Sequence, residues 1–306
     1  MKKIITAIKK NWTYATIAYA NKEIKYFKRQ QYKSILLVLF YPNFTLRWHK
    51  ILEKNAFLNS VLLKRPVLYT KPYKCYLSSK WKIEKRLKVI LDSYDFIKNK
   101  SFFKESINKK KILLKFNLKD NSSANIVFNY HDKFRNEGEM VVSIDIPDKG
   151  GIYYSLAFSF EELINNYWVI RIGCLQGANG KINNNRIREL HKNLYGMRPK
   201  ALLVFIMQQL AVDLDIKEIL VASNSIQAHR RKHLIHIPWK HTIYSDYDRF
   251  LTEICGELQK DGWYKLPMEF VKKDMIKIPS HKRAYYKKRY EMLDDLALKI
   301  SNINFN

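Results

Sequence analysis

Apolar and polar residues alternate through the middle of the chain, which is the pattern of half-buried strands. Two short strand-like runs come first, at 112–118 and 125–130. Strict alternation then covers 140–146, 154–160 and 168–174, with turn-forming residues after the first of these. The pattern predicts an antiparallel meander.

After the meander the apolar spacing becomes helical. A short helix is predicted at 185–194. Pro199 suits the first turn of a second helix, whose residues 202–214 are apolar on nearly every side. Such a helix must be buried. We expect it to form a crossover, after which the strand predicted at 218–223 runs parallel to the meander. The last predicted elements are a helix at 247–258, a strand at 262–266 and a helix at 284–300.

Together these elements predict an α+β fold with a mostly antiparallel, mixed sheet and a buried crossover helix. The distribution of charge predicts how the chain is divided. Through Lys115 there are 28 Lys and Arg against 6 Asp and Glu, whereas the rest carries 28 against 22, for a net charge of +28. We therefore expect a basic, mainly helical region at 1–110 and an α+β domain at 111–306.

The first 20 residues predict a basic amphipathic helix. Its apolar stripe is Ile4, Ile8, Trp12, Ala15 and Tyr19, and its other side carries Lys2, Lys3, Lys9 and Lys10. This pattern is typical of a helix in a membrane interface, where each Lys contributes about 1 kcal/mol beside anionic lipid. It equally describes a helix packed on its own domain. A third interpretation is nucleic-acid binding, because aromatic residues interleaved with basic ones suit base stacking.

The positive charge indicates an anionic partner, such as membrane lipid or a lipopolysaccharide precursor. The longest apolar run, 35–41, is far shorter than the ~20 residues of a membrane-spanning helix. No secretory signal is evident, and three widely spaced cysteines argue against a disulfide framework or a zinc site. We expect a cytoplasmic protein that can lie at the periphery of the inner membrane.

Several short motifs occur in a fixed order along the chain. They are Phe134–Glu139, Tyr154–Phe158, Ile172–Gly177, Leu194–Lys200, Val221–Asn224 and Lys282–Tyr286. This series resembles the VirK/YbjX family of Gram-negative bacteria over most of the chain. The resemblance implies a role linked to virulence, envelope integrity and resistance to antimicrobial peptides. The family has no settled catalytic residues, so the resemblance implies no mechanism.

The order of elements is also similar to that of GCN5-related N-acetyltransferases, which implies an acyltransferase-like fold and an acyl-CoA as donor. In such enzymes a glycine-containing loop presents backbone N–H groups to the pyrophosphate of the donor. The residues in that place are Gln176, Gly177, Asn179 and Gly180. The family loop opens directly into its helix, whereas here the helix begins only at Pro199. Arg198, just before it, is therefore a second candidate for holding the anion.

The polar residues that suit catalysis are Glu137 as a general base, Asn224 at a strand end and His229 as a base or anion contact. Each also has a structural interpretation, as an ion-pair partner or a turn residue. No metal is expected, because basic residues and no acidic ones surround the histidines from His229 to His241.

A second basic cluster lies near the end of the chain. It comprises Lys282, Arg283, Lys287, Lys288 and Arg289, and it is interpreted as an edge that binds lipid or lipopolysaccharide phosphate, or as a solvated helix face. Three functions stay open. The first is a protein that acts at the cytoplasmic face of the inner membrane. If this protein is an enzyme, we expect an acyl or aminoacyl transferase that acts on lipid or glycolipid precursors. The second is a non-catalytic binder of anionic lipid or of an envelope-biogenesis partner, and the third is an RNA-binding protein.

Overall fold

The computed structural model describes residues 2–130, 132–177, 184–228 and 246–305. The chain forms two compact units, Met1–Lys74 (unit 1) and Cys75–Asn306 (unit 2). The division predicted near residue 110 differs from this one by two helices, α5 (Ile83–Lys98) and α6 (Ser101–Ser106), which pack on the strands of unit 2.

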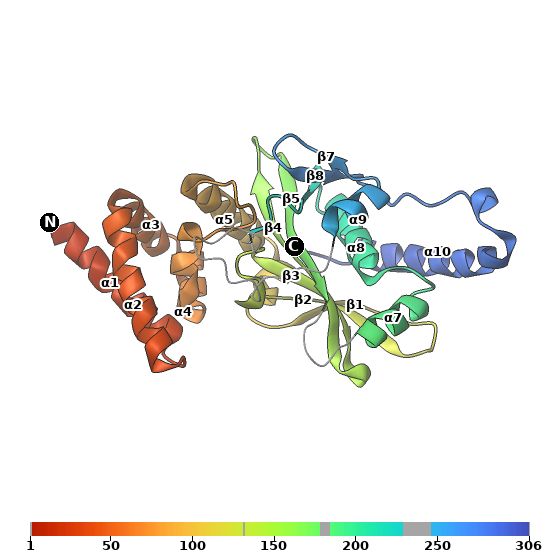
Figure 1. Cartoon of the computed structure of the whole chain (residues 1–306), viewed down its shortest axis with the longest axis horizontal. Helices are drawn as coiled ribbons and strands as arrows, with labels where there is room; N and C mark the ends of the chain where they lie inside the picture. Colours follow the sequence, from red (N-terminus) through yellow and green to blue (C-terminus); the bar gives the residue numbers. More distant parts are fainter. Residues whose placement is uncertain (1, 131, 178–183, 229–245, 306) are drawn as a thin grey trace. The chain divides into compact units, whose positions relative to one another are not determined.

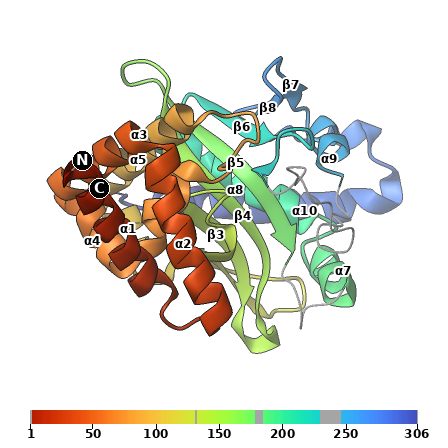
Figure 2. The ribbon, with the colours of Figure 1, turned by 60° about the vertical axis from the view of Figure 1, so that its left-hand side comes forward.

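Unit 1 is entirely helical. Its elements are α1 (Lys2–Tyr19), α2 (Ile24–Phe40), α3 (Pro42–Lys54), α4 (Ala56–Lys64) and a 3-10 helix, η1 (Pro66–Tyr73). Helices α1 and α2 run side by side as a hairpin (Figures 1 and 2). Its core includes Trp48, which is fully buried and donates a hydrogen bond of 3.1 Å from Nε1 to the carbonyl oxygen of Tyr69. That bond ties α3 to the 3-10 helix.

Unit 2 is built on one mixed sheet. Its strands are β1 (Lys111–Asn117), β2 (Ser123–Asn129), β3 (Met140–Ile146), β4 (Gly151–Glu162), β5 (Trp168–Gly177), β6 (Glu218–Ala222), β7 (Glu257–Leu258) and β8 (Trp263–Leu266). Their order is β1-β2-β3-β4-β5-β6-β8-β7. Strand β6 runs parallel to β5, and the other described pairs are antiparallel. The predicted meander, the parallel strand and the α+β class are confirmed.

The helices of unit 2 are α5 (Ile83–Lys98), α6 (Ser101–Ser106), α7 (Asn184–Asn193), α8 (Pro199–Asp213), α9 (Tyr247–Glu253) and α10 (Ser280–Ser301), with 3-10 helices η2 (Asp132–Phe134), η3 (Pro147–Lys149) and η6 (Met275–Lys277). In Figure 1, α8, α9 and α10 lie to the right of the central strands β3, β4 and β5, and α5 lies to their left. Helix α8 is the crossover between β5 and β6, as its all-round apolar sequence predicted.

The helix predicted at 247–258 is wrong in its second half. Helix α9 ends at Glu253, because Cys255 adopts a left-handed φ of 63° and the N–H of Gly256 bonds back to the carbonyl of Leu251. The chain then reverses, and Glu257 and Leu258 pair with β8 as an edge strand.

Strand β5 carries an irregularity that matters for the site. Ala157 pairs with Cys174 and Phe158 with Ile172, so Gly173 is left without a partner in the ladder. A Cβ on Gly173 would lie 2.1 Å from the carbonyl oxygen of Glu137, so only glycine fits. Pairing with β6 reaches only as far as Ile172, and the last residues of β5 continue beyond it.

A buried ion pair joins β4 and β5. Arg171 donates from Nε to Glu161 Oε2 over 2.7 Å, and Lys85 pairs with the same carboxylate. The guanidinium also lies 4.6 Å from the ring centroid of Trp263. Because Glu161 is fully buried, each charge depends on the other for its stabilisation.

Replacing Glu161 with Gln should therefore leave the Arg171 charge buried without a carboxylate and destabilise the protein by about 3–5 kcal/mol. Denaturant unfolding measures this change. The matched control is Asp95→Asn, which breaks an exposed pair with Lys98 and should cost less than about 1 kcal/mol. Equal effects of the two substitutions would contradict a structural role for the buried pair.

Candidate functional site

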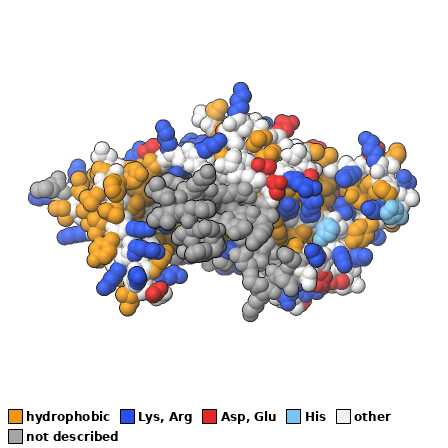
Figure 3. Space-filling view, viewed as in Figure 1, with side chains coloured by type: hydrophobic (Ala, Val, Ile, Leu, Met, Phe, Trp, Pro, Cys, Tyr) orange, Lys and Arg blue, Asp and Glu red, His pale blue; other side chains and the backbone are white. Residues whose placement is uncertain are grey.

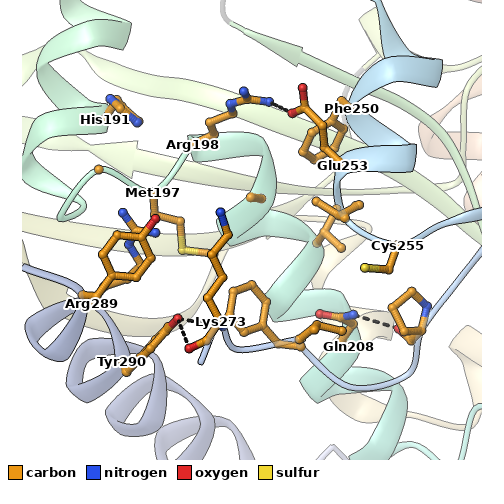
Figure 4. Close-up of a pocket in the computed structure, with 18 residues that line it drawn as sticks. His191, Met197, Arg198, Gln208, Phe250, Glu253, Cys255, Lys273, Arg289 and Tyr290 are labelled. Atoms are coloured by element: carbon orange, nitrogen blue, oxygen red, sulfur yellow. Dashed lines mark hydrogen bonds and ion pairs between the residues drawn. The ribbon is translucent and has the colours of Figure 1, made fainter. Parts of the chain in front are cut away.

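Helix α8 cannot bury all its apolar residues against the sheet alone. A cavity of about 660 Å³ lies along its other side, between α8, α9, the segment 267–273 and the first half of α10 (Figure 4). The walls are mainly apolar and include Met197, Ala201, Val204, Phe250, Ile254, Pro267, Phe270 and Val271.

The segment 267–273 forms one wall and is fixed at both ends. Gln208 of α8 donates from Nε2 to the carbonyl oxygens of Pro267 (2.8 Å) and Glu269 (3.2 Å). At the other end, the backbone N–H of Lys273 donates to the Tyr290 hydroxyl of α10 over 2.9 Å. These bonds hold the wall against α8 and α10, so the cavity is built by the fold.

Basic side chains gather around this apolar space. Arg198 pairs with Glu253 at one end of the cavity, while Gln208 lies at the other (Figure 4). The Lys273 side chain reaches towards the middle, and no described carboxylate pairs with it. Arg289 also lines the cavity, but its guanidinium already donates two hydrogen bonds to the carbonyl oxygen of Tyr195.

Among the described residues that line the cavity, Glu253 is the acidic one. Its hydrogen bond with Arg198 lowers the pKa of the Glu253 carboxyl, and Arg249 adds to the effect. The carboxylate therefore stays charged near neutral pH and neutralises Arg198.

A second pocket, of about 340 Å³, adjoins the cavity at the start of α8. It shares His191 and Arg198 with the cavity and adds Arg188, Lys200 and Tyr154. No acidic residue is among the described residues that line it. The N-terminus of α8 opens here, where the helix dipole favours an anion. We call this pocket the basic pocket.

Lys200 is held in an unusual environment for a cation. Its Nζ lies 4.0 Å from the ring centroid of Phe250. Burial lowers the pKa of Lys200, and the nearby charge of Arg198 lowers it further. Two neighbouring cations at a helix N-terminus, with no acidic residue in the first turn, are an unfavourable arrangement that a bound anion would relieve.

The predicted anion loop begins beside this pocket. Gly177 closes β5, and a Cβ there would lie 3.6 Å from the Tyr154 ring and 4.0 Å from Ile187, which both line the basic pocket. Gln176 precedes it at the end of the same strand. Asn179 and Gly180 lie outside the described residues. The end of β5 and Arg198 thus approach one hollow, although the cofactor role of these residues stays a prediction.

The polar residues proposed for catalysis lie elsewhere. The backbone of Glu137 packs against Gly173 on β5, and its charge acts on Lys133 and Cys174. Cys174 points to the opposite sheet face from its neighbour Leu175, which lines a small cleft with Lys200. Glu137 therefore lies across the sheet from the cavity.

Asn224 joins the end of β6 to the start of α9. Its Nδ2 donates to Asp246 Oδ1 over 3.0 Å, and its Oδ1 accepts from the N–H of Tyr247 over 3.3 Å. It is not among the lining residues of the cavity. His229 lies outside the described residues. Within the described ranges, no group of three or more His, Cys, Asp or Glu side chains is placed to hold a metal.

The residues of the basic cluster of α10 differ in their contacts. Arg289 lines the cavity, Arg283 donates to the carbonyl oxygens of Ile278 and Ile276, and Lys288 pairs with Glu291. Lys282 and Lys287 are exposed. Figure 3 shows basic and hydrophobic side chains side by side over α10.

The N-terminal lysines lie on α1 of unit 1. Lys10 pairs with Glu53, whereas Lys2, Lys3 and Lys9 are exposed. Their contact with lipid stays a prediction.

The sequence did not predict that four other residues line these pockets, namely Lys200, Lys273, Arg188 and His191. One signal was present, since Arg198 and Lys200 flank Pro199 at a predicted helix start, where cations are disfavoured. Lys273 carried no such signal, because only the path of the segment 267–273 brings it to the cavity.

The site therefore defines an α+β protein with an apolar cavity that has basic residues at one end. The chain belongs to the family described as "Protein of unknown function (DUF535)", whose model matches residues 22–302. It is 25% identical to the "Uncharacterized protein YbjX" of Escherichia coli K12 over 281 residues, which are 88% of this chain and 82% of that protein. The VirK/YbjX resemblance is thereby confirmed.

Two uncharacterized proteins of Haemophilus influenzae Rd are also similar. One is 28% identical over 61% of this chain and 59% of its own length, and the other is 36% identical over 41% and 40%. No solved structure matches the chain. Across the described residues, no helix has the length and hydropathy required to span a bilayer.

The role of Gln208 in holding the cavity wall can be tested by Gln208→Leu. The carbonyls of Pro267 and Glu269 lose their donor, so the protein should be destabilised by about 1–2 kcal/mol. Amide hydrogen exchange in 268–273 should also become faster. The control is Gln209→Leu on the same helix, for which exchange in this segment should not change. Unchanged exchange in Gln208→Leu would contradict the assignment.

Proposed function

We propose that this protein binds an anionic amphiphile, with the anionic head group at Arg198 and Lys200 and the apolar part in the cavity along α8. The class includes the lipid and glycolipid precursors of a bacterial envelope. The proposal is therefore in line with the envelope-linked role that the family resemblance implies, including support of resistance to antimicrobial peptides.

One observation carries the proposal: an apolar cavity and a pocket lined by basic residues lie next to each other at the start of α8. His191 and Arg198 line both spaces, so a ligand with an anionic head group and an apolar chain can contact both. The cavity volume of about 660 Å³ lies within the range of ordinary ligand sites, about 300–1,000 Å³. Apolar walls favour an acyl or prenyl chain, and they offer little to a fully polar metabolite.

The charge arrangement supports an anion as the head group. Arg198 presents a planar guanidinium that suits two oxygens of a phosphate, and Lys200 adds a second charge next to it. Glu253 forms an ion pair with Arg198. An incoming anion must therefore compete with this carboxylate, which makes Glu253 a determinant of affinity.

Binding is favoured over acyl transfer by the placement of the polar residues. Glu137 lies across the sheet, and Asn224 is engaged with Asp246 and Tyr247. Neither lines the cavity. Acyl or aminoacyl transfer, with an acyl-CoA donor at Gln176–Gly177 and Arg198, stays a prediction of the sequence.

The proposal predicts opposite effects for two neighbouring residues. Arg198→Gln should weaken binding of dodecyl phosphate about tenfold or more, because a charge-assisted hydrogen bond of about 1.5–3 kcal/mol is lost. Glu253→Gln should strengthen binding several-fold, since it frees Arg198. Isothermal titration calorimetry measures both.

Lys282→Gln on α10 is the matched control, because it removes an exposed charge outside the cavity. Dodecanol, which has no charge, should bind all of these variants equally. Failure of the wild-type protein to bind dodecyl phosphate, or equal affinities for Arg198→Gln and Lys282→Gln, would overturn the proposal.

The lowered pKa of Lys200 predicts an alkaline limit for binding. The charge of dodecyl sulfonate does not change between neutral and alkaline pH. Its affinity for the protein should be highest at neutral pH, where Lys200 is protonated. It should fall as the pH rises through the pKa of Lys200, because the deprotonated amine carries no charge. This fall should begin at a lower pH than an ordinary lysine would give. In Lys200→Arg it should disappear, and an identical pH profile in that variant would argue against Lys200 as an anion contact.

A further inference from the structure

Helix α2 of unit 1 has an apolar face that is exposed among the described residues. The helix buries Gln31, Ser34 and Val38, which follow one side at helical spacing. The opposite side exposes four large apolar residues, which we call the α2 outer face. They are Tyr32, Leu36, Leu39 and Phe40, with exposed fractions of 62%, 46%, 55% and 73%. Their spacing of four, three and one residues places them on a common side of the helix.

The neighbouring helix α1 extends this apolar surface. Trp12 is 37% exposed, and its ring meets that of Tyr32 edge-to-face, with centroids 6.1 Å apart. Ile5, about two turns before Trp12 on α1, is 49% exposed. Two adjacent helices therefore present one continuous surface with an aromatic pair at its centre.

The same helix carries basic residues beside the apolar ones. Lys25, Lys28, Arg29 and Lys33 lie on its exposed side. No ion pair with a described carboxylate neutralises Lys25, Lys28 or Lys33. Unit 1 as a whole has 16 Lys and Arg against two acidic residues, Glu23 and Glu53. Figure 3 shows hydrophobic side chains with basic ones around them over unit 1.

We propose that the α2 outer face, with Trp12 and Ile5, docks on an anionic lipid surface. Aliphatic side chains such as Leu36 and Leu39 enter the boundary between head groups and acyl chains, whereas they do not stack on nucleic-acid bases. Trp12 and Tyr32 have the amphipathic rings that favour this boundary. A second copy of the unit would bring a strongly positive face against itself.

The sequence pattern had placed membrane contact on α1. In the structure α1 buries Ala15 and Tyr19 of its apolar stripe within unit 1, so α2 supplies most of the exposed apolar surface. Docking on lipid involves only residues of unit 1. It does not depend on the cavity in unit 2 or on the function proposed for that cavity.

The test is flotation of the full-length protein with vesicles of phosphatidylcholine alone or with 30% phosphatidylglycerol, a composition of about three anionic lipids in ten. The wild-type protein should float only with the anionic vesicles, and less at high salt. The variant Leu36→Ser/Phe40→Ser should lose flotation. The variant Lys25→Gln/Lys28→Gln/Lys33→Gln should bind more weakly by about fivefold for each charge removed.

The matched control is Lys260→Gln/Lys277→Gln, which removes exposed charges from unit 2 outside the predicted lipid-binding cluster of α10 and should float like the wild type. All changed residues are exposed, so the variants should keep their thermal unfolding midpoints, and this is measured for each. Lipids brominated on the acyl chain should quench tryptophan fluorescence in the wild type more than in Trp12→Phe.

Three outcomes would overturn the proposal. The first is the absence of flotation with anionic vesicles, and the second is equal flotation of the α2 variants and the unit 2 control. The third is a loss, in the α2 variants, of RNA binding or of self-association measured by light scattering, with no effect on vesicles. That result would assign the surface to nucleic acid or to a second copy.

Discussion

The structure of unit 2 depends on one constraint: α8 is apolar on nearly every side, and no single surface can cover it. The sheet takes one side of the helix. The other side is covered by α9, α10 and the segment 267–273, which Gln208 and Tyr290 hold in place. These elements enclose the helix without filling the space beside it, and the cavity is what remains. The same helix starts at Pro199 between two cations, so its N-terminus, its charge and the apolar space meet at one point.

Electrostatics give this point its chemical character. Lys200 is partly desolvated next to Arg198, which lowers its pKa, and Glu253 supplies the compensating charge. An arrangement of two cations and one exchangeable carboxylate is suited to a ligand that brings its own negative charge. The buried pair of Arg171 and Glu161 serves a different purpose, because both groups are enclosed and interact with other groups of the protein.

Much of the fold could be predicted from one sequence, because strand alternation and helix periodicity are local properties. The meander, the crossover helix and the parallel strand β6 follow from such patterns. The end of α9 did not, since its reversal depends on a left-handed Cys255 and on a strand partner far along the chain. The site shows the same division. Arg198 was found because it precedes a helix, whereas Lys273 reaches the cavity only through the path of a segment without regular structure.

The sequence by itself determined the composition of the two surfaces: the excess of Lys and Arg, the apolar residues of α8, and the family to which the chain belongs. Tertiary structure decided which of these residues share a space. It set Glu137 across the sheet from the cavity and engaged Asn224 with α9. It also buried Ala15 and Tyr19 of the apolar stripe of α1 and left the outer face of α2 exposed. The physical reason is that a periodic pattern specifies a helix and its faces, while the neighbour that covers each face is selected by packing between segments distant in the chain.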